Sequence, residues 1–292
     1  HYQSITKAAE ALLLTQPAVS LQLKKLQDQF PIPLTEVIGR QVYITDFGRE
    51  IVKAAEQILA EVEAINYQTL TYKNQLAGKL KISVASTGKY VMPYFLTGFM
   101  QKYRGVDLVM DVTNKTMVVN SMEKNEVDFA LVSVIPEQLK TEQLELLENK
   151  LFFIGSPLLH NRNFKSIKAL FAHYPLLFRE PGSATRNAME EFIRVHELPV
   201  FKKIELTSNE ALKQALIAGL GYSIMPLIGI KNALQSGELE IVPHKNLPIV
   251  THWNLVWLKA KKLSPVAQAF LDYLNEEKDA IVRKNFSWCD DY

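Results

Sequence analysis

The alternation of apolar and polar positions in residues 15–30 predicts a helix with two different faces. Thr15 is a suitable N-cap, and Pro17 is tolerated in a first helical turn, where its missing N–H has no intrahelical partner to lose. Apolar residues recur at the three-to-four spacing of a buried face, at Val19, Leu23, Leu26 and Phe30. The opposite face carries a short, polar and mildly basic stripe made of Gln16, Ser20, Lys24 and Gln27.

This polar stripe has the chemistry of a DNA-recognition helix. Amide, hydroxyl and ammonium groups are the side-chain groups that pair with base edges and phosphates in a major groove. The preceding residues favour the same interpretation, because Ser4 can cap a helix through Leu12 and residues 13–15 leave room only for a tight turn. We therefore predict a helix-turn-helix. An ordinary amphipathic surface helix is the alternative for residues 15–30 taken alone.

A short wing is expected after the second helix. Residues 31–34, Pro-Ile-Pro-Leu, cannot continue a helix, and residues 40–44 alternate like a strand beside Gly39. Arg40 would lie at the tip of this wing, where a cation can reach the DNA backbone or minor groove. A solvated arginine without a DNA contact is the alternative.

A long helix is predicted from Thr45, which can cap it, to Gly78, which can stop it. Its apolar positions follow a four-three alternation: Ile51, Ala55, Ile58, Val62, Ile65, Thr69, Tyr72 and Leu76. This is the seam of a coiled coil, so two copies of the chain are expected to pair through residues 46–76. A helix that packs only within its own chain is the alternative.

From residue 80 onward the sequence pattern is typical of an α/β protein. Strands are predicted at 80–85, 106–112, 128–134, 175–178, 203–206 and 222–225, and helices at 89–103, 118–126, 184–196 and 210–218. Such alternation implies largely parallel sheets with helices on both faces. Two lobes follow, with the apolar strands 151–154 and 255–258 as crossovers and a last helix, begun by Ser264, that returns to the first lobe.

Polar residues gather where the predicted strands end. Because ligands of α/β sheets bind beyond the carboxyl ends of strands, these residues form the candidate ligand site: Ser86, Thr87, Lys89, Asn114, Ser133, Glu180, Ser183 and Asn209. Hydroxyls that precede helices lie where free N–H groups favour an anion, which predicts a small carboxylate or phosphate ester as ligand. Simple N-capping is the alternative for each hydroxyl, with Thr207 and Glu210 fitting a capping box.

Composition narrows the class of protein. The 292 residues are 48% hydrophobic and 22% charged, ordinary globular values, without an apolar run of membrane-spanning length or a signal peptide. A cytoplasmic protein with no membrane partner is expected. The six histidines and the single Cys289 show no metal-ligand spacing, and no serine lies in a nucleophile elbow. We therefore expect no metal, no cofactor and no enzyme activity.

The order of these parts resembles the LysR-type transcriptional regulators. The motif residues lie at 4–10, 15–20, 33–34, 39–40 and 45–48, and the rest of the chain looks like that family's linker helix and effector domain. The resemblance implies an all-α head plus an α/β domain: an N-terminal winged helix-turn-helix at 1–45, a linker helix at 46–78, and a two-lobed, periplasmic-binding-protein-like α/β effector domain at 79–292. Lobe I would comprise 79–154 and 256–292, and lobe II 155–255.

The same resemblance implies a function and partners. Gln16, Pro17, Ser20, Leu21 and Arg40 would face the groove of double-stranded operator DNA, Lys24 would contact phosphates, and the homodimer would pair further into a tetramer. Residues 86–90 and 179–183 look most like the branch that controls carbon-fixation operons, which implies a small anionic metabolite as effector. A segment before His1 is expected to be missing, because the visible start matches the end of the family's first helix.

Two features depart from the family pattern. Leu21 stands where the family often has a cation, and Thr35 stands where an aromatic residue usually follows Pro-Leu. Residues 1–50 also carry five cations and five anions, a net charge of zero. These features motivate an alternative, a small-molecule-binding protein with a vestigial DNA-binding head. An enzyme built on the two-lobed domain is a third alternative.

Overall fold

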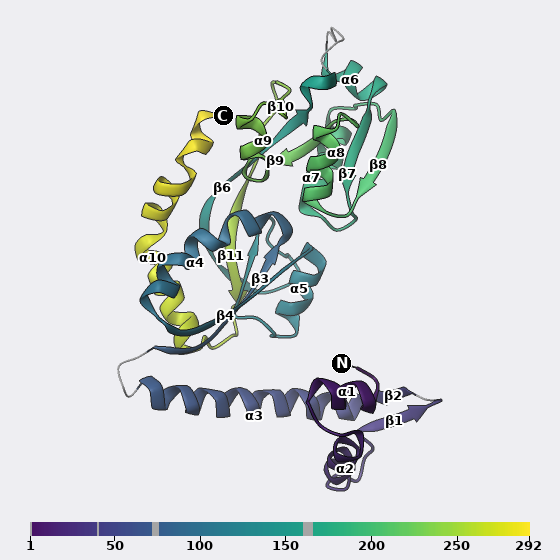
Figure 1. Ribbon diagram of the computed structural model, residues 1–292, viewed down its shortest axis with the longest axis vertical. Helices are drawn as coiled ribbons and strands as arrows, with labels where there is room; N and C mark the ends of the chain where they lie inside the picture. The colour runs from purple at the N-terminus through teal and green to yellow at the C-terminus, as the bar shows by residue number, and fades with distance from the viewer. Residues whose placement is uncertain (1, 40, 72–75, 160–165) are drawn as a thin grey trace. The chain divides into compact units, whose positions relative to one another are not determined.

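The computed structural model describes residues 2–39, 41–71, 76–159 and 166–292, with only the backbone described at residues 60 and 63–71 (Figure 1). The chain divides into two compact units, His1–Lys73 and Asn74–Tyr292. The first holds three helices and a hairpin, and the second holds two α/β lobes. Within the described ranges, no helix is both long and apolar enough to cross a membrane.

The first unit begins with the predicted helix-turn-helix. Helix α1, Ile5–Ala11, is capped by Ser4, whose hydroxyl accepts a hydrogen bond from Lys7 N at 3.4 Å. Leu13 turns the chain with a φ of +55°, and helix α2, Gln16–Gln27, follows. Thr15 occupies the N-cap position of α2 as expected, but its hydroxyl makes no capping hydrogen bond. Pro17 has removed one of the N–H groups that this hydroxyl would accept from.

Helix α2 ends earlier than the sequence pattern predicted, because Gln27 binds the loop that follows. Its Nε2 donates to the carbonyl of Ile32 at 3.2 Å, and its Oε1 accepts from Leu34 N at 2.6 Å. Gln27 therefore does not belong to the exposed polar stripe. Phe30 lies beyond the helix, and its ring meets the ring of Phe47 at 5.9 Å.

A two-stranded hairpin follows, formed by β1, Thr35–Ile38, and β2, Gln41–Ile44. Strand β2 was predicted, but β1 was not, because residues 35–38 have no alternating pattern and three of the four are exposed. The pairing of Ile38 with Gln41 creates the tight turn of a wing. Arg40, predicted at its tip, lies outside the described residues.

Helix α3, Asp46–Thr71, is continuous over 26 residues. Thr45 caps it as predicted, since its Oγ1 accepts from Gly48 N at 3.0 Å and donates to the carbonyl of Pro33. A Cβ at Gly48 would lie 2.1 Å from the Leu34 carbonyl oxygen, so only glycine allows this close approach. Gly78 does not stop α3, because it already lies in the next strand, paired with Val106.

The second unit is built on a seven-stranded sheet ordered β10-β6-β11-β5-β3-β4, with β9 beside β6. Strands β3, Ala77–Ala85, β4, Gly105–Thr113, and β5, Phe129–Val132, are parallel. Strands β6, Thr141–Gly155, and β11, Ile249–Leu258, are antiparallel to each other. Strands β9, Ser223–Pro226, and β10, Glu240–Ile241, pair with the end of β6. A separate parallel pair consists of β7, Pro175–Arg179, and β8, Lys202–Leu206.

Strands β6 and β11 connect the two lobes (Figure 1). They are the predicted crossovers, but both are longer than the apolar segments 151–154 and 255–258 indicated. The additional residues of β6 are mostly exposed or half-buried, whereas its last five residues are all buried. The early part of β6 pairs within lobe I, and its last residues pair with β9 and β10 of lobe II.

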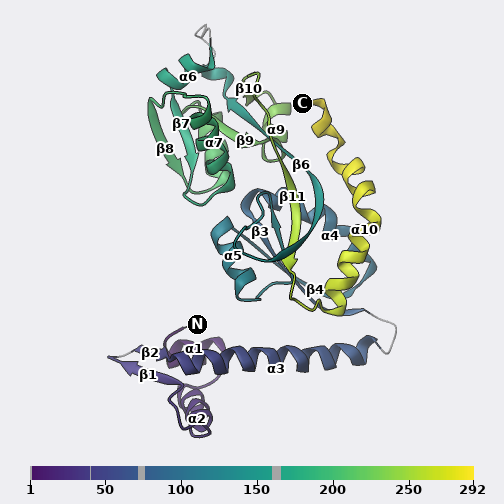
Figure 2. The ribbon, with the colours of Figure 1, turned by 180° about the vertical axis from the view of Figure 1, so that it is seen from behind.

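Lobe I is closed by helices α4, Met92–Lys102, α5, Lys115–Glu123, and α10, Pro265–Phe286. Ser264 caps α10 as predicted, and Phe270 of this helix packs on Phe99 of α4 with ring centroids 5.0 Å apart. Figure 2 shows α10 and α4 side by side from behind. Burying a phenylalanine side chain stabilises a fold by about 1.5–3 kcal/mol, so these rings anchor the lobe.

Lobe II is closed by α6, Ile167–His173, α7, Ala184–Val195, α8, Asn209–Ile217, and α9, Lys231–Gln235. Its core includes Phe153 and Tyr222, whose rings stack at 5.3 Å. Helix α8 is capped by Ser208, which accepts from Ala211 N at 3.0 Å. The predicted capping box of Thr207 and Glu210 is therefore wrong by one residue.

Candidate functional site

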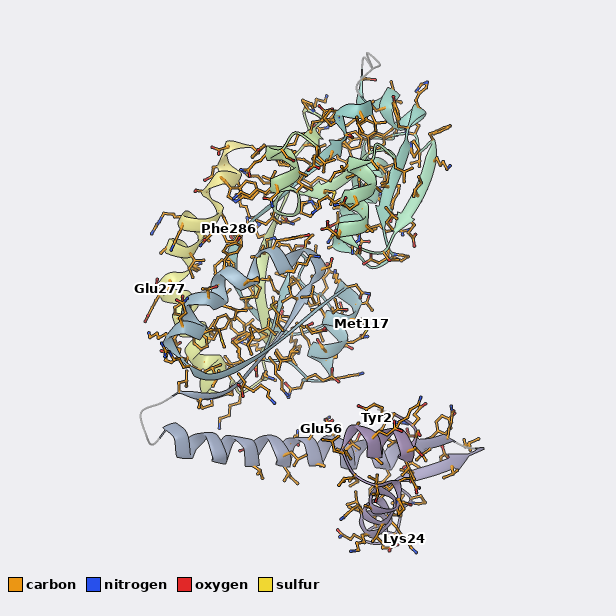
Figure 3. All side chains as sticks on the ribbon, viewed as in Figure 1. Tyr2, Lys24, Glu56, Met117, Glu277 and Phe286 are labelled. Atoms are coloured by element: carbon orange, nitrogen blue, oxygen red, sulfur yellow. The ribbon has the colours of Figure 1, made fainter. Side chains whose placement is uncertain are left out.

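Helix α2 presents a polar and partly basic face. Gln16, Pro17, Leu21 and Lys24 are exposed, and Ser20 is half-buried. Lys24 lies on the side of α2 away from α3 (Figure 3). None of the α2 side chains is fully buried, and Leu26, predicted on the buried face, is 43% exposed. The small helical unit does not enclose α2, so the polar face of this helix remains largely exposed.

Helix α3 leaves apolar side chains uncovered by its own chain. Ile58 is 64% exposed and Val62 is 48% exposed, and both lie on the predicted coiled-coil seam. The seam positions 65, 69 and 72 lie outside the described side chains. Exposed aliphatic residues at this spacing are typical of a helix that pairs with a second helix.

In the second unit, the carboxyl ends of β3, β7 and β8 bring polar side chains of both lobes together. Strand β3 ends at Ala85, and the short 3-10 helix η1, Ser86–Tyr90, follows it. Strand β7 ends at Arg179, and α8 begins at Asn209 after β8. Parallel strands place these ends at one edge of each lobe.

Ser86 joins the lobes directly. Its Oγ accepts from Arg179 Nη2 at 3.3 Å and from Asn209 Nδ2 at 2.9 Å. Asn209 is 4% exposed, and its Oδ1 has no hydrogen-bond partner in the structure. Because a buried polar atom without a partner is costly, this cluster retains hydrogen-bonding capacity for another group.

Arg179 is the centre of this cluster, and we call Ser86, Arg179, Glu180 and Asn209 the interlobe cluster. Arg179 is 2% exposed, and its Nε and Nη2 each donate to a Glu180 carboxylate oxygen at 2.8 Å. Its Nη1 has no partner among the described groups. The carbonyl of Arg179 accepts from Arg186 Nη1 at 2.9 Å, which fixes the end of β7. A buried guanidinium requires an anion, and in this structure the Glu180 carboxylate supplies it.

A second contact crosses between the lobes beside the interlobe cluster. The Tyr90 hydroxyl donates to Glu210 Oε2 at 3.5 Å. Burial and the nearby Glu210 raise the pKa of Tyr90, so its phenol stays protonated. A hydrogen bond from Lys213 lowers the pKa of Glu210, with Lys89 adding a weaker attraction, so the acceptor stays ionised. Among the described residues, three hydrogen bonds, two at Ser86 and one at Tyr90, therefore link these edges of the lobes.

The predicted effector residues divide into two groups. Ser86, Glu180 and Asn209 meet in the interlobe cluster. Thr87 and Ser183 are buried, and each is close in sequence to a member of the cluster. Lys89 lies over the Tyr90 ring at 5.0 Å. Asn114 instead caps α5, accepting from Met117 N at 3.0 Å, which is the capping alternative. The hydrogen bonds of the described residues include none from Ser133 to the cluster.

Sequence reasoning did not assign a role to Arg179. The available signal was a cation that ends the apolar strand 175–178, at the edge where ligands of such sheets bind. A cation next to an acid resembles a solvated pair in sequence, and only the fold shows that Arg179 is buried and that Glu180 is largely covered. Groups of three or more acidic, histidine or cysteine side chains able to hold a metal ion are not found in the described ranges.

A cavity of about 200 Å³ lies apart from the interlobe cluster. It is lined by residues 147–150 of β6, by Leu227 and Ile228, and by the end of α10. Lys150 at its edge donates to the carbonyls of Cys289 and Tyr292 at 3.1 and 3.4 Å. The side chains of the interlobe cluster are in direct hydrogen-bonded contact with one another.

Comparisons with known proteins match both units. Residues 1–49 match the bacterial regulatory helix-turn-helix protein family, lysR family, and residues 73–279 match the LysR substrate binding domain. The HTH-type transcriptional activator CmpR of Synechocystis is 35% identical over 95% of this chain and 92% of that protein. The RuBisCO operon transcriptional regulator of Allochromatium vinosum is 35% identical over 94% and 92%.

Solved structures show the same architecture. The CcmR regulatory domain of Synechocystis PCC6803, in complex with 2-PG, is 34% identical with a TM-score of 0.63, covering 69% of this chain and 97% of that chain. A full-length OxyR variant from Pseudomonas aeruginosa has a TM-score of 0.64 at 21% identity, covering 96% and 90%. The second likeness concerns the fold alone.

Proposed function

Because the chain belongs to the LysR family of bacterial transcriptional regulators, we propose that it binds operator DNA and that a small anionic metabolite, bound between its lobes, changes this binding. DNA binding is assigned to residues 1–45, pairing of two copies to α3, and effector binding to the domain that follows. Such a regulator works on chromosomal DNA, which places it in the cytoplasm. Two relatives named as RuBisCO operon transcriptional regulators support carbon-fixation genes as its targets.

The DNA-binding assignment rests on the exposed face of α2. Gln16 and Ser20 supply groups that pair with base edges, and Lys24 supplies a phosphate contact. Pro17, Leu21 and Arg40 complete the proposed contacts, with Leu21 offering an apolar contact to a base. Pairing through α3, and further pairing into a tetramer, would link two or four DNA-binding domains. Their combined binding would compensate for the weak attraction of each domain to DNA, since residues 1–50 have a net charge of zero.

The effector assignment rests on one observation, the buried Arg179 with partners from both lobes. The matching CcmR domain was solved with 2-PG, and this supports a small anion as the ligand of this chain as well. A ligand that bridges the lobes makes different contacts in different lobe arrangements. Only this difference in affinity can bias the spacing of the DNA-binding heads.

Salt dependence of DNA binding tests the proposed function. We expect the full chain to bind the DNA upstream of its own gene, with an affinity that falls steeply between low and high salt because counterions compete for phosphates. The alternative of a vestigial head is favoured by Leu21, which is 53% exposed where a cation would bind phosphate. Metabolite binding without salt-sensitive DNA binding would establish that alternative.

A further inference from the structure

Glu180 fills the position on Arg179 that an effector anion would take. Its two carboxylate oxygens accept from Nε and Nη2 of Arg179, both at 2.8 Å, in the side-on arrangement that guanidinium groups offer to carboxylates and phosphates. The structure gives Arg179 this one ion pair among the residues that it describes. The other nearby acids are engaged elsewhere, Glu205 by Arg186 and Glu210 by Lys213.

The two partners of this ion pair are held very differently. Arg179 belongs to β7, paired with Leu206 of β8, and its carbonyl is held by Arg186. Glu180 lies just beyond the strand, in the loop that contains Gly182 with a φ of +84°, and its side chain is 15% exposed against 2% for Arg179. The cation is therefore fixed, while the carboxylate can rotate toward solvent.

Resting on the proposed function, we propose that Glu180 is an internal competitor for the effector: its carboxylate occupies Arg179 in the ligand-free protein, and an effector anion binds by displacing it. The Nη1 of Arg179 remains an unpaired donor in the cluster, because the Glu180 carboxylate engages only Nε and Nη2. An incoming anion replaces Glu180 and reaches Ser86 and Asn209 as well.

The replacement of Glu180 by an anion favours some ligands over others. A monocarboxylate that replaces Glu180 exchanges one carboxylate for another and gains little. A phosphate dianion brings a second charge and a third oxygen, so it can accept from Arg179, Ser86 and Asn209 together. Glu180 lowers the affinity for every anion by the same factor, so only a ligand that makes these additional contacts, such as a phosphorylated one, binds well in its presence.

The test compares Glu180→Gln with the wild-type full chain by calorimetry, using 2-PG, inorganic phosphate and acetate as probes. Glutamine keeps the shape of the side chain and removes the competing charge. We expect 2-PG and phosphate to bind about tenfold more tightly to Glu180→Gln, because the displaced interaction loses its charge-assisted hydrogen bonds. Acetate should gain by the same factor, because the competing carboxylate is removed for every anion.

Two further variants serve as controls for Glu180→Gln. Glu137→Gln removes an equal charge from an exposed position of lobe I and should leave all affinities unchanged. Glu180→Asp keeps the charge but shortens the side chain, so it should increase the affinity for 2-PG by less than Glu180→Gln does. It replaces Glu180→Gln in the test if glutamine disturbs folding. Thermal melts should show that Glu180→Gln is less stable without ligand and gains more from 2-PG than the wild type, since the ligand then supplies the missing anion.

The outcomes distinguish a Glu180 that competes with the effector from a Glu180 that positions Arg179 for it. Weaker or unchanged 2-PG affinity in Glu180→Gln, with the wild type binding, would show that Glu180 positions Arg179 for the ligand; the proposal would be overturned and the proposed function would stand. If neither protein bound 2-PG or phosphate, the effector site itself would be wrong, and both proposals would fall.

Discussion

Arg179 illustrates what a single side chain reveals in the folded protein and not in the sequence. In the sequence it is one cation in a polar loop, beside an acid. In the fold it is 2% exposed, and its Nη2 lies 3.3 Å from Ser86 of the other lobe. Strand periodicity could place it at the end of β7, but the contact with Ser86 depends on how the two lobes close, which no local pattern encodes.

Gln16 provides the residue-level prediction for DNA recognition. Gln16→Ala should reduce discrimination between operator and scrambled DNA by about 1–3 kcal/mol, because a bidentate amide contact to a base would be lost. Gln22→Ala serves as the matched control, since Gln22 is an exposed amide of α2 outside the polar stripe. Fluorescence anisotropy with both DNAs measures the difference. Equal discrimination in Gln16→Ala and the wild type would remove α2 from base readout.

Cys289 provides a residue-level prediction for thiol chemistry. Burial raises the pKa of the Cys289 thiol to about 11, so the reactive thiolate fraction at pH 8 is about a hundredfold below that of a thiol at its ordinary value of 9.0. Alkylation by iodoacetamide should therefore be slow in the native protein and fast in urea. Mass spectrometry over time measures both rates, and similar rates would contradict the burial of this thiol.

At the scale of elements, the predictions succeeded where a pattern is local and failed where tertiary contacts decide. The alternation of strands and helices after residue 80 and the cap of α10 at Ser264 follow from periodicity and capping, and the structure confirms them. The prediction of a largely parallel sheet is wrong for the main sheet, because the long strands β6 and β11 and the short β9 and β10 all pair antiparallel. Strand β1 was not predicted, because it forms through pairing with β2 and has no apolar pattern of its own. Gly78 was misread as a helix stop, since glycine is equally compatible with the start of β3.

Helix α3 carries the element-level prediction. Ile58→Glu places a charge on the exposed apolar seam and should convert a dimer into monomers, because two like charges would face each other across the paired helices. Gln57→Glu adds the same charge at a neighbouring position off the seam and should leave the assembly intact. Light scattering after size-exclusion chromatography gives the mass of each. An unchanged mass for Ile58→Glu would assign pairing to another surface.

At the scale of the whole molecule, a binding event between the lobes must alter how heads on paired helices meet DNA. The interlobe contacts comprise the hydrogen bonds of Ser86 and Tyr90 and a few apolar contacts, such as Ile228 on the core of lobe I, whereas each lobe has its own apolar core. Interfaces of this kind open at a lower free-energy cost than a core. An anion that enters there can therefore change the angle between lobes without unfolding either one.

The most direct test of this account is a footprint of the full chain on the DNA upstream of its own gene, with and without 2-PG, beside the variant Arg179→Gln. The account predicts a protected site whose length or hypersensitive positions change with 2-PG in the wild type. Arg179→Gln should protect the same DNA and ignore 2-PG. A footprint that responds equally in both proteins, or in neither while 2-PG binds, would contradict the claim that an anion on Arg179 controls DNA binding.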